Sequence, residues 1–208
     1  LREDTDGVAT LTLNRPRQLN SLSESMLEAL HDILENIGAD QSVRVVVITG
    51  SGRAFSTGHD LKQVRARPDE PYYQRLFASS SALMLRIQKL PQPVIARVNG
   101  IATAAGCQLV ATCDLAIASE NATFAVSGIN HGLFCSTPSV ALSRNVSRKQ
   151  AFEMLFTGEF IDAGEALDKG LVNQVAREDG LDEAVAALCA KITAKSRVAV
   201  ETGKRMFY

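Results

Sequence analysis

The stretch from Val94 to Ala118 reads VIARVNGIATAAGCQLVATCDLAIA, and it constrains the fold more than any other part of the sequence. A first apolar run ends at Asn99-Gly100, and small residues follow it. An apolar pattern of helical period resumes from Gly106, before a second apolar run begins at Leu115. This order predicts a strand, a tight turn, a helix and another strand.

The small residues at the entrance of the predicted helix have two interpretations. Ala102, Ala104, Ala105 and Gly106 leave the backbone uncovered, so its free N–H groups and the positive end of the helix dipole can face a ligand oxygen. Alternatively, the small side chains serve only to pack the helix closely on a sheet. The residues themselves leave both interpretations open.

Composition excludes several classes of partner. The chain has 208 residues, 46% of them hydrophobic, which favours one large domain over two small ones. Its 22 basic and 23 acidic residues are scattered and give a net charge of −1, so we expect no nucleic-acid or membrane partner. No apolar run approaches the ~20 residues that span a bilayer, and the start, LREDTDG, lacks the profile of a signal peptide. We therefore expect a soluble protein.

The four cysteines show no metal-binding or redox spacing. Cys107, Cys113, Cys135 and Cys189 lie among apolar or small residues without a CxxC pair. This pattern favours buried free thiols in a reducing compartment over disulfides or a zinc site. The chain also begins without Met and stops inside a predicted helix, which is consistent with a fragment of a longer protein.

Strand and helix patterns alternate along the chain and predict an α/β fold with right-handed crossovers. The β-branched run 43–49 indicates a strand buried on both faces, and thus a parallel sheet. Capping-box spacing begins at Ser21, Ser147 and Asp162, and glycines suited to end helices stand at 158 and 170. The other strands are expected at 8–14, 94–98, 115–118, 122–126 and 171–175. The other helices are expected at 26–37, 72–90 and 181–194, near residue 138, and after the possible loop 50–62.

Four segments, in order, resemble one known family. They are LTLNRPRQLNSL, AFSTGHDLK, PVIARVNGIATAAGCQLVATCDLAIAS and FTGEFIDAGEALDKGLVNQV. Together they resemble the crotonase superfamily, the enoyl-CoA hydratase/isomerase family, from the first strand to about Met206. Within the family, the run HGLFCSTPSVALSR is most similar to the enoyl-CoA hydratase domain-containing protein 3 group.

This resemblance implies a crotonase-like spiral of ββα units over residues 1–195. Residues 196–208 would begin a C-terminal helical segment used in trimer contacts. The implied ligand is an acyl-CoA or enoyl-CoA thioester, acting as substrate rather than as a resident cofactor, with no metal. The implied assembly is a homotrimer or a dimer of trimers. The implied compartment is the cytoplasm in bacteria and the mitochondrial matrix in eukaryotes.

The family's shared chemistry is polarisation of the thioester carbonyl by two backbone N–H groups, which stabilise an enolate-like oxyanion. By motif, these are the amides of His59 and Ala105, the latter where the family usually has Gly. Lys62 resembles a residue near the adenine end of CoA and could pair with a phosphate, or it is a solvated surface lysine. The resemblance places further substrate contacts at Asp60, Leu61, Lys62, Gly106, His131 and Cys135.

Both positions of the hydratase glutamates are changed. The first falls on Gln108, whose amide can orient a water but cannot accept its proton, and the second falls on Gly128. Residues 121–152 contain neither Asp nor Glu, so no substitute acid stands nearby. Since a positioned acid or base contributes roughly 10²–10⁴ in rate, efficient hydration is not expected.

Three other side chains are candidates for a role in catalysis. His131 is either a titrating group or a hydrogen-bonded structural histidine, and Cys135 is either a nucleophile or a buried inert thiol. The side chain of His59 is expected to point away from the acyl group while its amide points in. The resulting hypothesis is an atypical hydratase/isomerase-like enzyme, and its rival is a non-catalytic acyl-CoA-binding or scaffold protein. Nucleotide binding is disfavoured, because neither GxGxxG nor GxxxxGK[ST] occurs in the chain.

Overall fold

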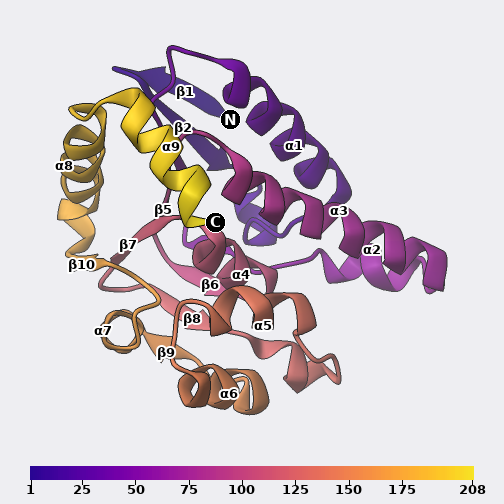
Figure 1. The fold of residues 1–208 in the computed structure, drawn as a ribbon. Helices are drawn as coiled ribbons and strands as arrows, with labels where there is room; N and C mark the ends of the chain where they lie inside the picture. The colour runs from indigo at the N-terminus through magenta and orange to yellow at the C-terminus, as the bar shows by residue number, and fades with distance from the viewer.

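A computed structural model describes all 208 residues of the chain (Figure 1). The strands are β1 (Arg2–Thr5), β2 (Val8–Leu13), β3 (Val45–Gly50), β4 (Ala54–Ser56), β5 (Val94–Val98), β6 (Ile101–Thr103), β7 (Leu115–Ser119), β8 (Thr123–Ala125), β9 (Ile161–Asp162) and β10 (Gln174–Ala176). The α-helices are α1 (Glu24–Ala39), α2 (Leu61–Ala66), α3 (Glu70–Lys89), α4 (Ala105–Thr112), α5 (Ser136–Ser143), α6 (Arg148–Thr157), α7 (Ala163–Asp168), α8 (Leu181–Thr193) and α9 (Arg197–Phe207). Short 3₁₀ turns lie at Pro16–Gln18, Ser127–His131 and Glu178–Gly180.

The strands form two sheets, and successive turns of a spiral each contribute one strand to each sheet. One sheet has the order β1-β2-β3-β5-β7-β10 and the other has the order β4-β6-β8-β9. The consecutive pairs β3/β4, β5/β6 and β7/β8 each place one strand in each sheet, and helices follow each pair. The predicted spiral of ββα units is therefore confirmed.

The larger sheet is parallel from β2 to β10, and only β1 pairs antiparallel. Every residue of β3 is buried, as the β-branched run predicted. A strand buried on both faces fits an interior position in a parallel sheet that helices cover.

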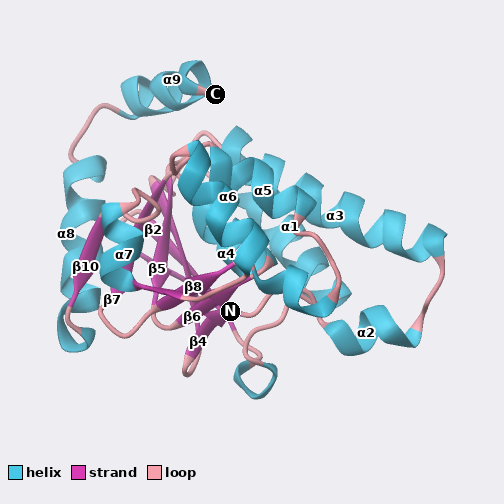
Figure 2. Cartoon of the chain, turned by 90° about the horizontal axis from the view of Figure 1, so that it is seen from below, coloured by secondary structure: helices cyan, strands magenta, loops and turns pink.

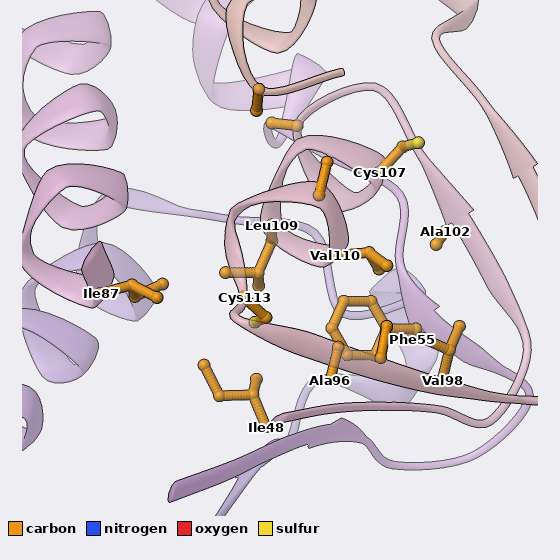
Figure 3. Packing of buried hydrophobic residues seen from close by; sticks show 14 of the residues in the cluster. Ile48, Phe55, Ile87, Ala96, Val98, Ala102, Cys107, Leu109, Val110 and Cys113 are labelled. Atoms are coloured by element: carbon orange, nitrogen blue, oxygen red, sulfur yellow. The ribbon is translucent and has the colours of Figure 1, made fainter. Parts of the chain in front are cut away.

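The core is packed between α4 and the two sheets. Figure 3 shows the ring of Phe55, from β4, between Val110 of α4 and Val98 of β5. All three side chains are at most 1% exposed. The helix therefore rests directly on both sheets, and this packing holds its N-terminus in place.

Several boundaries differ from the sequence-based expectations. Helix α1 begins one residue after Ser23, which accepts a hydrogen bond from the N–H of Met26, so Ser23 rather than Ser21 is the N-cap. Ser147 is at the expected N-cap but its side chain makes no capping hydrogen bond, whereas Asp162 forms the full capping box with Glu165. The last strand lies at Gln174–Ala176 rather than at 171–175, because its pairing with β7 begins at Gln174.

Strands β4 and β6 were missed in the sequence. Each has only three residues, and both lie in runs of small residues that favour loops. Their parallel pairing with each other builds the second sheet.

Helix α9 is joined to α8 by a short loop and lies at the edge of the molecule (Figure 2). One buried cation attaches it to the body of the fold. The ammonium group of Lys204 donates to the carboxylate of Asp114 at 2.6 Å and to the carbonyls of Ile87 and Gln92, both at 2.9 Å. Tyr208 adds a hydrogen bond to the other carboxylate oxygen of Asp114.

None of the helices combines the length and apolar character required to cross a membrane. No group of three or more His, Cys, Asp or Glu side chains is arranged to hold a metal ion.

Candidate functional site

A cavity of about 640 Å³ opens where the N-terminal ends of α2, α4 and α5 converge. Its walls come from segments 57–64, 103–105 and 127–138, together with Phe77 of α3. These segments belong to three successive turns of the spiral, so the fold alone brings them together.

Most of the residues singled out from the sequence meet at this cavity. The residues that line it are His59, Asp60, Leu61, Lys62, Ala105, Gly128, His131 and Cys135. Gly106 and Gln108 lie behind the wall, inside the first turns of α4. Gly106 is required there, because a Cβ at this position would lie 2.1 Å from the carbonyl oxygen of Ser56.

The backbone of His59 is held by Leu22. The N–H of Leu22 donates to the carbonyl of Gly58 at 2.7 Å, and the N–H of Asp60 donates to the carbonyl of Leu22 at 3.3 Å. In a parallel bridge of this kind, the residue between the two bonded neighbours turns its own N–H and C=O to the opposite side. The N–H of His59 therefore points away from Leu22.

The amide of Ala105 lies next to the same segment. Ala105 is the first residue of α4, where helical N–H groups have no partner within the helix. A Cβ on Gly58 would lie 2.9 Å from this amide nitrogen, so the chain before His59 packs closely against the start of α4. Gly58 also has φ +82°, which favours glycine. Two adjacent segments thus bring the His59 and Ala105 amides to one wall of the cavity.

Ala104, the N-cap of α4, has a strained backbone with φ 52° and ψ −123°. Strain of this kind costs on the order of 1–3 kcal/mol and is found mainly at functional sites. The N–H of Ala104 donates to the carbonyl of Ala125 at 3.0 Å, which holds the residue in this conformation. The turn into α4 is therefore rigid at the point where Ala105 presents its amide.

The imidazole of His59 forms part of the cavity wall. Its Nδ1 is buried without a hydrogen-bond partner, and its ring lies edge-on to Phe77 with the ring centres 5.3 Å apart. Burial lowers the pKa of His59 from 6.5 to about 4, because the charged form would lose its hydration. The side chain is therefore neutral at physiological pH.

Asp60 is fixed by an ion pair and by the helix that follows it. One carboxylate oxygen accepts from Arg15 at 3.1 Å, and the other accepts from the N–H of Lys62 at 3.2 Å and caps α2. Burial opposes ionisation, but the hydrogen bond from Arg15, those from the N–H groups of Lys62 and Gln63, and the Arg15 charge together hold the pKa of Asp60 below its ordinary value. Asp60 is therefore the N-cap of α2. The side chain of Lys62 is exposed at the cavity edge.

Neutral polar groups surround the inner part of the site. The hydroxyls of Thr103 and Ser127 lie 2.8 Å apart on the cavity wall, and the Thr137 hydroxyl donates to Oε1 of buried Gln108 at 3.3 Å. The sequence analysis missed Thr103, Ser127, Thr137 and Phe77. Phe77 is 41% exposed and lines the cavity. Thr103 and Ser127 stand next to Ala104 and Gly128, which had been singled out, whereas no such signal marked Thr137 or Phe77.

Gly128 lies in a crowded place. A Cβ at Gly128 would lie 2.6 Å from the carbonyl oxygen of Leu133 and 2.7 Å from the sulfur of Cys135. Any larger residue therefore requires the backbone of the 133–135 loop to move. The thiol of Cys135 and a main-chain carbonyl occupy the space where a side chain at position 128 would begin.

All four cysteines are free, as expected. Burial raises the pKa of Cys107 to about 12 and that of Cys189 to about 11, and it also raises that of Cys113. The pKa of Cys135 is raised by burial as well, although a hydrogen bond from Gly128 partly opposes the shift. Because the thiolate is the nucleophile, the structure favours an inert thiol at Cys135. His131 is exposed, and no hydrogen bond fixes its ring.

Comparisons with known proteins identify the family of the chain. The family model for enoyl-CoA hydratase/isomerase matches residues 3–208. An enoyl-CoA hydratase structure from Mycobacterium smegmatis is 60% identical with a TM-score of 0.98, and the match covers 100% of this chain and 81% of that one. The structure of human enoyl-CoA hydratase domain-containing protein 3 is 45% identical with a TM-score of 0.97 over 100% of this chain and 82% of that one.

Curated sequences give the same grouping. The rat mitochondrial enoyl-CoA hydratase domain-containing protein 3 is 46% identical over 203 residues, which is 98% of this chain and 68% of that protein. The subgroup resemblance seen in the run HGLFCSTPSVALSR is thus supported over the whole chain. The match to the family model, the identity to these relatives and the shared spiral together show that the chain belongs to the enoyl-CoA hydratase/isomerase family, the crotonase superfamily.

Proposed function

We propose that the protein binds a CoA thioester in the 640 Å³ cavity and polarises its carbonyl between the amides of His59 and Ala105. The observation that supports the proposal is the close packing of Gly58 against the amide nitrogen of Ala105, because it holds the segment that carries His59 beside the start of α4. Two preorganised donors of this kind stabilise an oxyanion in a site that excludes water. The reaction that this polarisation supports is loss of a proton from the carbon next to the carbonyl to water, which leaves the enolate, followed by return of a proton from water to the same carbon.

Hydration is not the proposed main reaction. Gln108 can donate and accept hydrogen bonds but cannot take a proton from water, and its Oε1 already accepts from Thr137. Position 128 offers no side chain, and the sulfur of Cys135 lies beside it. Neutral hydroxyls and an amide therefore surround the place where the two hydratase carboxylates would stand.

Two measurements test the proposal. Titration with butanoyl-CoA and with free CoA reports binding, and deuterium incorporation at the α-carbon of butanoyl-CoA reports turnover. We expect tighter binding of the thioester than of free CoA, together with measurable exchange. Replacing Ala105 by Val should weaken thioester binding, because the larger side chain crowds the oxyanion position. Equal binding of butanoyl-CoA by Ala105→Val and the parent would show that the carbonyl lies elsewhere.

The rival function is an acyl-CoA sensor or scaffold without turnover. It is favoured by the neutral polar lining and by the protonated thiols. Tight thioester binding with no α-carbon exchange would support this rival over the enzyme.

We propose three further properties from the family resemblance. Residues 1–195 form the spiral core, and 196–208 begin a C-terminal helical segment that takes part in a homotrimer or a dimer of trimers. The thioester is the substrate, and no resident cofactor is needed. The location is the cytoplasm in a bacterium and the mitochondrial matrix in a eukaryote, and the vertebrate relatives are named mitochondrial. Light scattering tests the assembly, and a monomer would overturn it.

A further inference from the structure

The proposed oxyanion donor at His59 is a backbone group, so its direction depends on what holds the chain on either side. Its N–H faces away from Leu22 because Gly58 and Asp60 both bond to Leu22. This bridge is isolated and belongs to neither sheet. Further bonds join the two segments at a distance from His59, from the N–H of Thr57 to the carbonyl of Leu19 at 3.2 Å and from the N–H of Glu24 to the side chain of Gln63 at 3.1 Å. The direction of the His59 amide matters because a shift of about 1 Å at a reacting group can cost ~10²-fold in rate.

Arg15 spans this isolated bridge. One arm of its guanidinium donates to the carbonyl of Ser21 at 3.0 Å, directly before Leu22. The other arm donates to the carboxylate of Asp60 at 3.1 Å, directly after His59. A planar, rigid fork is suited to fixing two acceptors at once. Arg15 therefore links the two segments whose pairing directs the His59 amide.

The loop that carries Arg15 is itself firmly anchored. Asn20 accepts from the N–H of Arg15 at 2.9 Å and donates to the carbonyls of Ser51 and Ala54. Asn20 is fully buried and has φ 53°, a left-handed conformation that asparagine tolerates. The hydroxyl of Ser56 adds a bond to the carbonyl of Asn20 at 2.9 Å.

The ion pair is partly shielded from water. The side chains of Arg15 and Asp60 are 29% and 12% exposed. Asp60 lines the cavity, whereas Arg15 lies behind it and does not line it. A bound ligand would thus meet Asp60 and the His59 amide but not the guanidinium.

We propose that Arg15 is a positioning residue for the oxyanion site: through Ser21 and Asp60 it sets the direction of the His59 N–H. The inference rests on the proposed carbonyl polarisation at His59 and Ala105. It assigns Arg15 an effect on the reacting carbonyl and none on recognition of the CoA moiety.

The test uses butanoyl-CoA labelled with ¹³C at the thioester carbonyl. The infrared stretch of this carbonyl falls in frequency when it is polarised, so the shift on binding reports the two donors directly. In Arg15→Met we expect at least half of the shift to be lost and α-carbon exchange to fall about 10- to 100-fold. The affinity for free CoA should change less than twofold. Arg15→Lys, which keeps the charge and several donors, should recover part of the shift.

Arg2 provides a matched control. Its guanidinium also bridges two acidic side chains, Asp4 and Asp40, and is 27% exposed, but it lies outside the cavity. Arg2→Met should keep the full carbonyl shift and exchange rate. If Arg15→Met does not fold, Asp60→Ser replaces it, because serine can still cap α2 while the carboxylate bound by Arg15 is lost.

The outcomes separate the two proposals. A parent that binds butanoyl-CoA without any carbonyl shift would overturn the proposed function. A parent with a clear shift that Arg15→Met or Asp60→Ser retains in full would overturn the role of Arg15 alone. A loss of shift equal in Arg2→Met and Arg15→Met would also overturn it, because the effect would then follow general stability.

Discussion

The neutral imidazole in the cavity wall makes the stability of the protein depend on pH. The His59 pKa is about 4 in the folded chain and 6.5 for an unperturbed side chain. Between these values the unfolded chain binds a proton that the folded chain does not, so lowering the pH stabilises the unfolded state. The stability that His59 contributes is therefore complete above about pH 6.5 and is lost progressively as the pH falls towards 4.

The size of the effect follows from the shift. A difference of one pKa unit corresponds to about 1.4 kcal/mol, so we expect a loss of about 1 kcal/mol at pH 5.5 and about 3 kcal/mol near pH 4. Urea unfolding at fixed protein concentration, from pH 7.5 to 4.5, measures it. Other groups also titrate, so the parent is compared at each pH with His59→Gln and His59→Phe.

Both variants lack the titrating group but differ in polarity and shape. We expect them to share one pH dependence, with the parent falling more steeply than either. Parallel curves for all three proteins would refute the burial of a neutral His59. If the stability of the parent falls more steeply with pH than that of one variant but not the other, the effect comes from packing rather than from the proton.

Three further predictions concern the inner site and the C-terminal helix. Gly128→Ala should destabilise the fold by about 1–3 kcal/mol, because the added Cβ meets the Leu133 carbonyl at 2.6 Å, whereas Gly180→Ala, with open space around it, should change little in the same urea titration. The parent should hydrate crotonyl-CoA far more slowly than the ~10–10³ s⁻¹ of ordinary enzymes, and a parent rate in that range would contradict the assignment of Gln108 and Gly128. The hydration rate of the double variant Gln108→Glu with Gly128→Glu should exceed that of either single variant only if the 133–135 loop can move. Lys204→Met should lower the free energy of unfolding by about 3–5 kcal/mol, because it leaves the half-buried Asp114 carboxylate without its cation. Arg177→Met, in an exposed ion pair, should lower it by less than about 1 kcal/mol. Equal effects in thermal or urea unfolding would refute the importance of the buried pair.

The parts of the fold that could be predicted from sequence are those where one local signal dominates. The β-branched run 43–49 predicted a buried parallel strand, and the apolar stripe of α8 predicted its bounds to within one residue. Strands β4 and β6 could not be found, because three residues cannot show an alternating pattern. Their pairing depends on contacts between different turns of the spiral.

The site also combines features that a local signal reveals with features that depend on contacts between distant segments. Short motifs singled out His59, Ala105 and Gly128, which line one cavity, and Gln108, which lies behind its wall. At Gly128 the φ is ordinary and the obstacle to a side chain is steric, which the sequence does not reveal. The role inferred for Arg15 arises from a contact 45 residues away along the chain, which a local pattern cannot contain.

The pairing of β4 with β6 carries one extra residue, since Ala54 pairs with Ile101 and Ser56 with Ala102, which leaves Phe55 without a partner. This extra residue is a β-bulge, and it sets the register between two turns of the spiral. Removing it would turn Ser56 to the opposite face of β4, and the hydrogen bond from its hydroxyl to the carbonyl of Asn20 would be lost. The number of residues in β4 therefore decides whether Ser56 can anchor Asn20, and Asn20 in turn holds the loop that carries Arg15.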